Sequence, residues 1–454
     1  MAKMTVERIR EAEETRKAYR REKSTLETKI IKNEEWYKRR HNQFIKKEAD
    51  DLNPVSAWLF NCIASKHAKV MDNYPTFNCL AREKNDVEEA KKLSSILPVI
   101  LKQNDFEDVY DKCWWYKLKQ GVACYGVFWD GSKLNGLGDI KISKIDMLNL
   151  FWKGGIEDIQ DSPNVFEIKA VDNDALEKMY PELKGKLGYS PDIPRYANDN
   201  ETDTNNMSLV VDWYYKIQME DGSTVLHYCK YCDENILYSS EDDENYAERG
   251  FYDHGLYPYV VDVLYPEENT IAGFGYVDIC KEPQTYIDKL DTYIQENAQQ
   301  GAAPRYFYKG EENAINIEDF ADVTKKLIRV NGNLDNIKPV DYKPLDSIYV
   351  SVKQEKIEEL KETSGNRDVS NGGVTSGATS ASAISAMQEA GGALDRDMIK
   401  ASYRSYVKII NICIELIRQF YDVDRCFRIT GENGKPDYVY YHNSGITMQP
   451  QAEQ

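Results

Sequence analysis

Apolar residues recur at every third or fourth position, or at multiples of that spacing, through residues 55–120. This is the period of a helix that buries one face. The positions are Val55, Leu59, Ile63 and Val70, and the same spacing continues over Val87–Lys102 and Phe106–Leu118. The pattern therefore predicts that residues 55–120 are mainly helical.

The period changes after Gly121, where apolar and polar residues alternate between turns that contain Gly and Asp. Alternation of this kind is typical of strands with one buried face. It appears in GVACYGVFWDG, GDIKISKID, LVVDWYYKIQMEDGSTVLHYCKYC and LYPYVVDVLYP. The pair Asp221-Gly222 lies between two alternating stretches and suits a two-residue hairpin turn. We expect a β-rich middle region of about 150 residues.

Two long helices are predicted after Pro266, and they bracket a shorter segment of mixed pattern. The first covers Asp278–Gln300 and would be about 35 Å long. Its apolar stripe consists of Ile279, Tyr286, Ile287, Leu290, Tyr293 and Ile294. The second covers Asp346–Thr363 and would be about 27 Å long. Between them, Arg305–Pro344 has the strand-like stretches RYFY and KLIRV around a short helical candidate.

A segment poor in apolar residues, Ser364–Ser382, separates the second of these helices from a third. Thirteen of its 19 residues are Gly, Ser, Thr or Asn, so we expect a flexible loop rather than part of a core. Long loops inside a compact region are commonly functional, although a plain linker is the alternative. The third helix is predicted over Ala383–Tyr421, with Gly391-Gly392 weakening it. A strand pair around Gly431–Gly434 follows it.

The composition is that of a folded, water-exposed protein, since 41% of the residues are hydrophobic and 30% are charged. No run approaches the roughly 20 apolar residues that a membrane span needs, so no membrane association is expected. The first residues are charged throughout, which argues against a secretory signal. The nine cysteines are scattered and odd in number, which is typical of reduced thiols in a cytosolic setting.

The net charge of -18 argues against a protein that reads DNA sequence through a basic surface. The charge is uneven, because residues 1–50 carry 15 Lys and Arg against 10 Asp and Glu. This basic segment has a helix-forming composition, and we expect an exposed helix or, alternatively, a peripheral docking arm for an acidic partner. Its prominent cations are Arg20, Arg21, Lys38, Arg39 and Arg40.

Acidic residues cluster between Asp233 and Asp253, with Arg249 as the cation among them. Clustered carboxylates can bind a divalent metal ion. The spacing of a regular metal-binding loop does not occur here, so a solvated hairpin loop is the favoured interpretation.

No motif in the sequence indicates a reaction, so we expect no enzymatic activity, catalytic residue, cofactor or bound metal. The GxxxxGK[ST] phosphate loop and the HExxH and GxSxG motifs do not occur. Gly273-Phe274-Gly275 lacks the longer dinucleotide-binding pattern and is interpreted as a turn. Cys229 and Cys232 form a single CxxC near His227, whereas zinc needs four ligands. The alternation in LHYCKYC favours two adjacent thiols on a strand.

The order of the expected elements resembles the portal, or head-to-tail connector, proteins of tailed bacteriophages. A helical start, a β-rich middle, a long helix, a small α/β insertion, a second long helix, a Gly/Ser-rich loop and a long kinked helix follow one another over residues 50–421. The segments EPQTYIDKLDTYIQENAQQGAAPRYFY and ETSGNRDVSNGGVTSGATSASAISAMQEAGG carry the resemblance most clearly. It implies a portal-like α+β fold that is mainly helical, with a β-rich wing region, paired long stem helices and a small α/β clip.

In that family the subunits form a closed ring, typically of about twelve copies, around a channel for double-stranded DNA. The resemblance implies these domains in chain order: wing 1–277, first stem helix 278–303, clip 304–344, second stem helix 345–363, tunnel loop 364–382, long wing or crown helix 383–421, and short crown or C-terminal tail 422–454. It implies a structural protein rather than an enzyme. The location would be the portal vertex of the capsid in the virion, and the host cytoplasm during assembly.

The resemblance also implies the partners. They are further copies of the chain, double-stranded DNA that passes without sequence recognition, the terminase, the major capsid or scaffolding protein, and head-completion or tail proteins.

An acidic wall suits such a channel, because basic walls would bind phosphates tightly and stop DNA from sliding. Over a stem of about 35 Å, a duplex presents about 20 phosphate charges. The candidate acids of the channel wall are Asp288, Asp291, Glu296, Glu355, Glu358 and Glu359. The candidate residues of the DNA-channel loop are Arg367, Ser370, Asn371, Gly372, Gly373 and Thr375, of which Arg367 could touch phosphate transiently.

Other functions stay open from the sequence alone. One is another ring-forming head-tail adaptor, and another is a cytosolic scaffold without DNA contact. A third is a metal-dependent nuclease that uses the acids at Glu241–Glu244.

Overall fold

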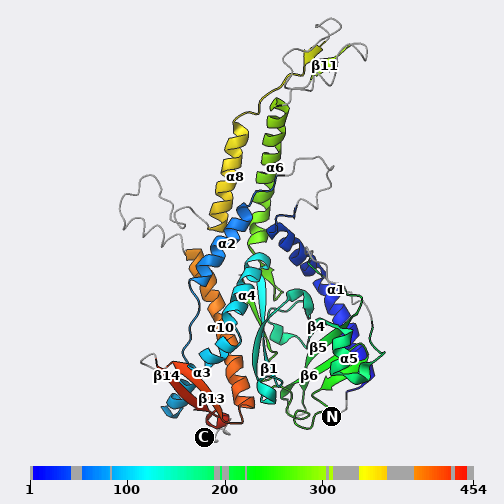
Figure 1. The fold of residues 1–454 in the computed structure, drawn as a ribbon, viewed down its shortest axis with the longest axis vertical. Coiled ribbons are helices and arrows are strands. Elements are labelled where there is room, and N and C mark those ends of the chain that lie inside the picture. The colour runs from blue at the N-terminus through cyan, green and yellow to red at the C-terminus, as the bar shows by residue number, and fades with distance from the viewer. Residues whose placement is uncertain are drawn as a thin grey trace. The chain divides into compact units, whose positions relative to one another are not determined.

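The computed structural model describes residues 4–41, 54–81, 84–188, 195–196, 204–219, 222–302, 306–309, 337–365, 393–430 and 435–446. The chain divides into two compact units (Figure 1). The larger unit comprises Met1–His41, Leu59–Ile279 and Ser364–Gln454, and the smaller unit comprises Asn42–Trp58 and Cys280–Thr363. Each unit is described by itself below.

An antiparallel sheet of strand order β3-β4-β5-β6-β7 forms one part of the larger unit among the residues described. Its strands are Leu150–Trp152, Asn164–Asp172, Met207–Gln218, Thr224–Cys232 and Asn235–Ser239. The predicted hairpin is confirmed, because β5 pairs with β6 in a register that sets Tyr215 opposite His227. Gly222 has φ +84°, which a glycine in a tight turn adopts without strain. Asp221 lies outside the described residues.

Helix α1 (Val6–Tyr37) packs along this sheet, as Figure 1 shows. Ile9, Ala12 and Tyr19 join one apolar cluster with side chains of the sheet. Those sheet residues include Phe151, Phe166, Val211, Trp213 and Tyr231. The predicted helix is confirmed, but it is not exposed throughout, because one face is buried and includes the charged residues Arg16 and Lys23. Its role as a docking arm for an acidic partner stays a prediction.

A second antiparallel sheet, of order β2-β1-β8, lies at the centre of the larger unit. Its strands are β1 (Val122–Asp130), β2 (Asp139–Ile145) and β8 (Tyr259–Val263). Helices α4 (Phe106–Gln120) and α10 (Ala393–Phe420) pack against it. The same unit contains α3 (Val87–Gln103), which packs on α4 and α10, and most of α2 (Trp58–Met71). Figure 1 shows α4 and α10 beside β1. These elements confirm the helical prediction for residues 55–120 and the strands that follow it.

Gly275 allows two backbone segments to approach closely. A Cβ at Gly275 would lie 2.7 Å from the backbone nitrogen of Gly121, which itself has φ +84°. Gly273 and Phe274 form the short strand β10, which pairs with β9 (Tyr265–Pro266). The interpretation of Gly273-Phe274-Gly275 as a turn is therefore wrong, and the glycines serve close packing of backbones.

Buried polar groups fasten α10 to the rest of the larger unit. In its body, Ser402 Oγ donates to Asp262 of β8 at 2.7 Å, and Lys117 of α4 donates to the same carboxylate at 2.8 Å. Just beyond its end, the Tyr421 hydroxyl donates to Asp139 of β2 at 2.7 Å. The predicted third helix is confirmed over Ala393–Phe420, whereas residues 383–392, with Gly391-Gly392, lie outside the described residues.

The C-terminal strand pair is confirmed as the antiparallel hairpin β13 (Arg425–Thr430) and β14 (Pro436–Tyr441), which packs on α3. Remaining short elements of the larger unit are the helix α5 (Asn173–Met179) and 3-10 turns at Lys84–Asp86, Leu134–Gly136, Met147–Asn149, Ile159–Asp161, Pro181–Leu183 and Asn443–Gly445.

The smaller unit consists mainly of two long helices that run side by side (Figure 1). These are α6 (Tyr276–Ala302), from Cys280 onward, and α8 (Ile348–Ser364), up to Thr363. The described part of the segment between them contains the paired strands β11 (Tyr306–Tyr308) and β12 (Ile337–Pro339). Both predicted long helices are confirmed. The stretch KLIRV and the short helical candidate fall within residues 310–336, outside the described residues.

Candidate functional site

Two carboxylates of α6 in the smaller unit are engaged in polar contacts within the chain. Asp288 of α6 is 7% exposed and accepts hydrogen bonds from Ser56, at 3.0 Å from both its backbone nitrogen and its hydroxyl, and from Gln284 at 2.9 Å. Asp291 of α6 forms an ion pair with Lys353 of α8. The Asp291–Lys353 pair therefore links α6 to α8, whereas the contacts of Asp288 link α6 to the segment that contains Ser56.

The six candidate acids of the channel wall lie in two different environments. Asp288 and Asp291 are engaged within the chain by the contacts above. The other four acids are exposed: Glu296 on α6, and Glu355, Glu358 and Glu359 on α8. Glu359 pairs with Lys356 at 2.6 Å, and Glu358 with Lys361 at 3.5 Å, both within one turn of α8. Four of the six candidate acids are therefore exposed in the single chain, and their place in a channel wall stays a prediction.

Large apolar and aromatic side chains also lie exposed on the smaller unit, which sequence reasoning did not anticipate. The predicted stripe on α6 is divided, because Ile287 is fully buried whereas Tyr286 and Tyr293 are about half exposed. The exposed set consists of Tyr286, Tyr293, Tyr306, Phe307, Tyr342, Ile348, Tyr349 and Val350. Apolar surface grouped in this way marks an interaction site more often than a solvated face. The signal available in the sequence was the presence of two tyrosines, Tyr286 and Tyr293, in this otherwise aliphatic stripe.

The candidate loop residues Arg367, Ser370, Asn371, Gly372, Gly373 and Thr375 lie outside the described residues. The structure describes the chain up to Gly365 and again from Ala393. Their proposed role therefore stays a prediction.

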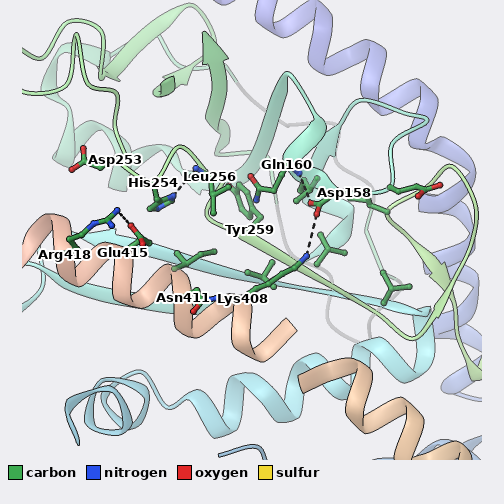
Figure 2. Close-up of a pocket in the computed structure, with 17 residues that line it drawn as sticks. Asp158, Gln160, Asp253, His254, Leu256, Tyr259, Lys408, Asn411, Glu415 and Arg418 are labelled. Atoms are coloured by element: carbon green, nitrogen blue, oxygen red, sulfur yellow. Dashed lines mark hydrogen bonds and ion pairs between the residues drawn. The ribbon is translucent and has the colours of Figure 1, made fainter. Parts of the chain in front are cut away.

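A cavity of about 690 Å³ opens in the larger unit between α10 and the segments around Asp158 and His254 (Figure 2). Four of its charged lining residues form two pairs, since Lys408 lies 3.6 Å from Asp158 and Arg418 bonds to Glu415. Burial, with a smaller contribution from Arg418, lowers the pKa of His254 to about 4, so its ring is neutral near neutral pH. This mixture of paired charges and a neutral imidazole forms no recognisable catalytic arrangement.

The acidic segment between Asp233 and Asp253 is partly bound into the fold. Glu241 accepts hydrogen bonds from Arg8 of α1 at 2.6 Å and from the Tyr215 hydroxyl at 2.5 Å. Burial alone would raise the pKa of Glu241, but these hydrogen bonds outweigh it and hold the pKa below its ordinary value. The interpretation of this segment as a wholly solvated loop is wrong for Glu241, whose side chain is 2% exposed.

The part of the chain that the structure describes gives no support for metal binding. There, no three His, Cys, Asp or Glu side chains come together as a metal site would require. Cys229 and Cys232 lie on strand β6, as predicted, but they belong to different apolar clusters of the sheet. His227 contacts the Ser240 hydroxyl at 3.0 Å.

Comparison with protein families identifies the chain. The family model described as phage P22-like portal protein matches residues 16–262 and 225–454, two overlapping segments that together cover nearly the whole chain. The chain belongs to this portal protein family. A portal protein has a structural role between phage head and tail, and membership places the chain with proteins that form oligomeric rings at a capsid vertex. Among the curated proteins, none matches the chain.

The family assignment favours the portal interpretation over a head-tail adaptor of another type. The model of this portal-family chain, with about half of it helical and several small sheets, is compatible with a portal fold. None of the helices among the described residues combines the length and the apolar character that crossing a bilayer demands.

Proposed function

We propose that the chain assembles into a ring of about twelve subunits at one capsid vertex, through which double-stranded DNA enters during packaging and leaves during ejection. The observation that carries this proposal is the portal family match from residue 16 to residue 454. In it, residues 1–277 act as the wing and residues 304–344 as the clip. The ring would also be the platform on which terminase and head-completion proteins dock.

The exposed apolar set of the smaller unit supports assembly with further copies. Tyr286 and Tyr293 of α6, and Ile348 and Val350 of α8, are between 47% and 59% exposed in the single chain. A pair of helices cannot bury all of its apolar surface by itself, and interface cores are rich in aromatic residues. In a ring, the neighbouring subunit's helix pair would cover these side chains.

The exposed acids of the helix pair support a channel that does not grip DNA. Glu296, Glu355, Glu358 and Glu359 would face phosphates across solvent, and repulsion would keep the duplex from binding to the wall. Lys356 and Lys361 lie beside Glu359 and Glu358, so the wall is only partly neutralised locally. Screening over about 8–10 Å limits this repulsion to short range.

Electron microscopy of the purified chain tests the proposal directly. We expect rings with a central opening wide enough for a DNA duplex. Compact monomers at concentrations that should support assembly would contradict the portal function. Incubation with duplex DNA and Mg²⁺ or Mn²⁺ tests the nuclease alternative, and DNA cleavage by the purified protein would favour that alternative instead.

A second experiment tests the DNA-channel loop. Deleting Gly372–Thr375 and replacing Arg367 by Ala should impair DNA packaging or retention if the loop steadies DNA. Arg428→Ala provides a control matched in charge, because Arg428 is exposed on β13 in another part of the chain. Unchanged packaging and retention in the loop variant would refute the role of the loop.

A further inference from the structure

Lys66 of α2 is a buried ammonium that contacts two segments far from it in the sequence. Its side chain is 1% exposed. Nζ donates to the backbone carbonyl oxygen of Gly365 at 3.3 Å and forms an ion pair with the carboxylate of Asp395. The ammonium also lies 5.8 Å from the centroid of the Tyr276 ring, whose face attracts cations.

The two partners of Lys66 stand at the two ends of one chain segment. Gly365 is the last described residue before residues 366–392, and Asp395 is in the first turn of α10, which follows them. Gly365 has φ +64°, the conformation with which a chain commonly leaves a helix, and its carbonyl lies beyond the last helical residue, Ser364. The chain therefore leaves and re-enters the described fold at one ammonium group.

Lys69, one turn along α2, strengthens the site at the Asp395 side. Its Nζ lies 3.1 Å from Asp395, and its side chain is 24% exposed. Lys69 thus binds the re-entry end, whereas Lys66 binds both ends. This difference separates the two lysines experimentally.

A buried ion pair is not needed for stability in itself, because well-packed apolar residues often replace one without loss. The same unit holds a comparable pair, Lys117 with Asp262 at 2.8 Å, with side chains 1% and 3% exposed. Lys117 also donates to Ser402, in the body of α10 rather than at its start. The two pairs are alike in burial and chemistry and differ in what they connect.

We propose that Lys66 and Asp395 form an ionic clamp that holds the two ends of the 366–392 segment together on α2. The clamp positions the segment relative to α2 and α10, whatever the segment contacts. The clamp follows from the contacts of Lys66, Gly365 and Asp395. Its consequence for DNA retention rests on the function proposed above for the loop within that segment.

Amide hydrogen exchange on the full-length assembled chain tests the clamp. In Lys66→Met we expect exchange to become at least about tenfold faster at both ends, in peptides that cover residues 361–365 and 394–398, because local opening no longer breaks the ion pair. The double variant Lys66→Met/Asp395→Leu replaces the pair by apolar groups. It should keep the thermal midpoint close to wild type while exchange at both ends stays fast.

Two variants serve as controls. Lys69→Met should speed exchange around Asp395 and leave residues 361–365 close to wild type. Lys117→Met, matched in burial, should speed exchange in the middle of α10 rather than at both segment ends. Wild-type exchange at both ends in the double variant, or equal acceleration in Lys66→Met and Lys117→Met, would overturn the clamp.

A functional measurement distinguishes this inference from the portal proposal. If fast exchange in the double variant accompanies a loss of packaged DNA similar to that of the loop deletion, the clamp positions the loop for DNA. If exchange changes as expected but neither the loop deletion nor the double variant alters DNA retention, the clamp stands and the DNA role of the loop is refuted.

Discussion

The side chain of Lys23 on α1 is buried. Nζ donates to the carbonyl oxygens of Met147 at 2.8 Å, Leu148 at 3.2 Å and Leu150 at 2.7 Å, and it lies 4.0 Å from the centroid of the Phe151 ring. Burial lowers the pKa of Lys23 to about 7. Lys23, although it belongs to the basic N-terminal segment, is therefore part of the contact between α1 and the sheet region.

The lowered pKa of Lys23 makes the stability of the folded protein depend on pH. Between the folded pKa of about 7 and the ordinary value of 10.5, the unfolded chain holds the ammonium and the folded chain the neutral amine. The unfolded state then binds more protons, so stability rises with pH through this window, by at most about 1.4 kcal/mol per pH unit. We expect the thermal midpoint to rise from about pH 7 to about pH 9, and Lys23→Met to flatten the rise.

Lys32→Met is the control for this pH prediction, because Lys32 is exposed on the same helix. It should keep the wild-type slope of thermal midpoint against pH. A slope in Lys23→Met equal to that in Lys32→Met would assign the pH dependence to other groups.

Arg8 and Arg10, two residues apart on α1, test what burial does to an ion pair. Arg8 pairs at 2.6 Å with Glu241, whose side chain is 2% exposed, whereas Arg10 pairs at 2.9 Å with Glu234, and both of those side chains are 60% exposed. Arg8→Ala would leave a buried carboxylate short of its cation, so we expect the free energy of unfolding to fall by about 3 kcal/mol. Arg10→Ala should not change it measurably. Chemical denaturation of both variants checks this, and equal effects would contradict it.

At the scale of elements, the paired helices α6 and α8 combine an ion pair between them with exposed aromatic side chains. Tyr286 and Tyr293 are seven residues apart and exposed on the same helix. In a ring they would contact the neighbouring copy, and truncating an aromatic side chain at an interface core costs about 1–3 kcal/mol of association. We expect Tyr286→Ser/Tyr293→Ser to dissociate into monomers at concentrations at least about tenfold higher than wild type does.

Analytical ultracentrifugation measures this shift, and circular dichroism verifies that the monomer stays folded. Tyr438→Ser is the matched control, because Tyr438 is 58% exposed on β14 of the larger unit. Assembly that is equally weakened in the control, or unchanged in the double variant, would exclude these tyrosines from the interface.

Helical and strand periods were sufficient to predict most of the elements, because α4, α6, α8 and the β5–β6 hairpin each bury one face at a regular spacing. The period says which positions face inward but not how a charged residue is accommodated there. For this reason α1 was expected to be exposed, although Lys23 finds its acceptors more than 120 positions later in the chain. The same limit affects the candidate acids, since Asp288 is buried by Ser56, 232 residues away, and Glu296 is not.

At the scale of the whole molecule, the net charge of -18 is distributed so that the basic N-terminal segment is partly neutralised within the fold. Arg8, Arg10 and Lys23 are paired with acids or carbonyls of the chain. The exposed acids Glu358 and Glu359 of α8 pair with lysines of the same helix at the protein surface. The surface of the purified protein should therefore bind free duplex DNA weakly.

Charge reversal tests that expectation. Glu355→Lys/Glu358→Lys/Glu359→Lys should convert weak binding into measurable, salt-sensitive retention of duplex DNA, with the logarithm of affinity falling by about 0.9 per phosphate contact for each decade of salt. The control variant Asp174→Lys/Glu182→Lys/Glu248→Lys makes the same change in net charge at exposed sites of the larger unit. Equal DNA retention by both variants would indicate a general charge effect rather than a channel wall.

The fastening of α10 at its start, in its body and beyond its end has a mechanical consequence. Asp395, Ser402 and Tyr421 are bonded to α2, to β8 with α4, and to β2 respectively. A pull along the helix axis would load all of these bonds at the same time, so detaching the helix would require a high force. A pull across the axis at one end would break these bonds one after another, each at a lower force. The direction of a force on the start of α10 therefore decides whether the helix stays attached or is released.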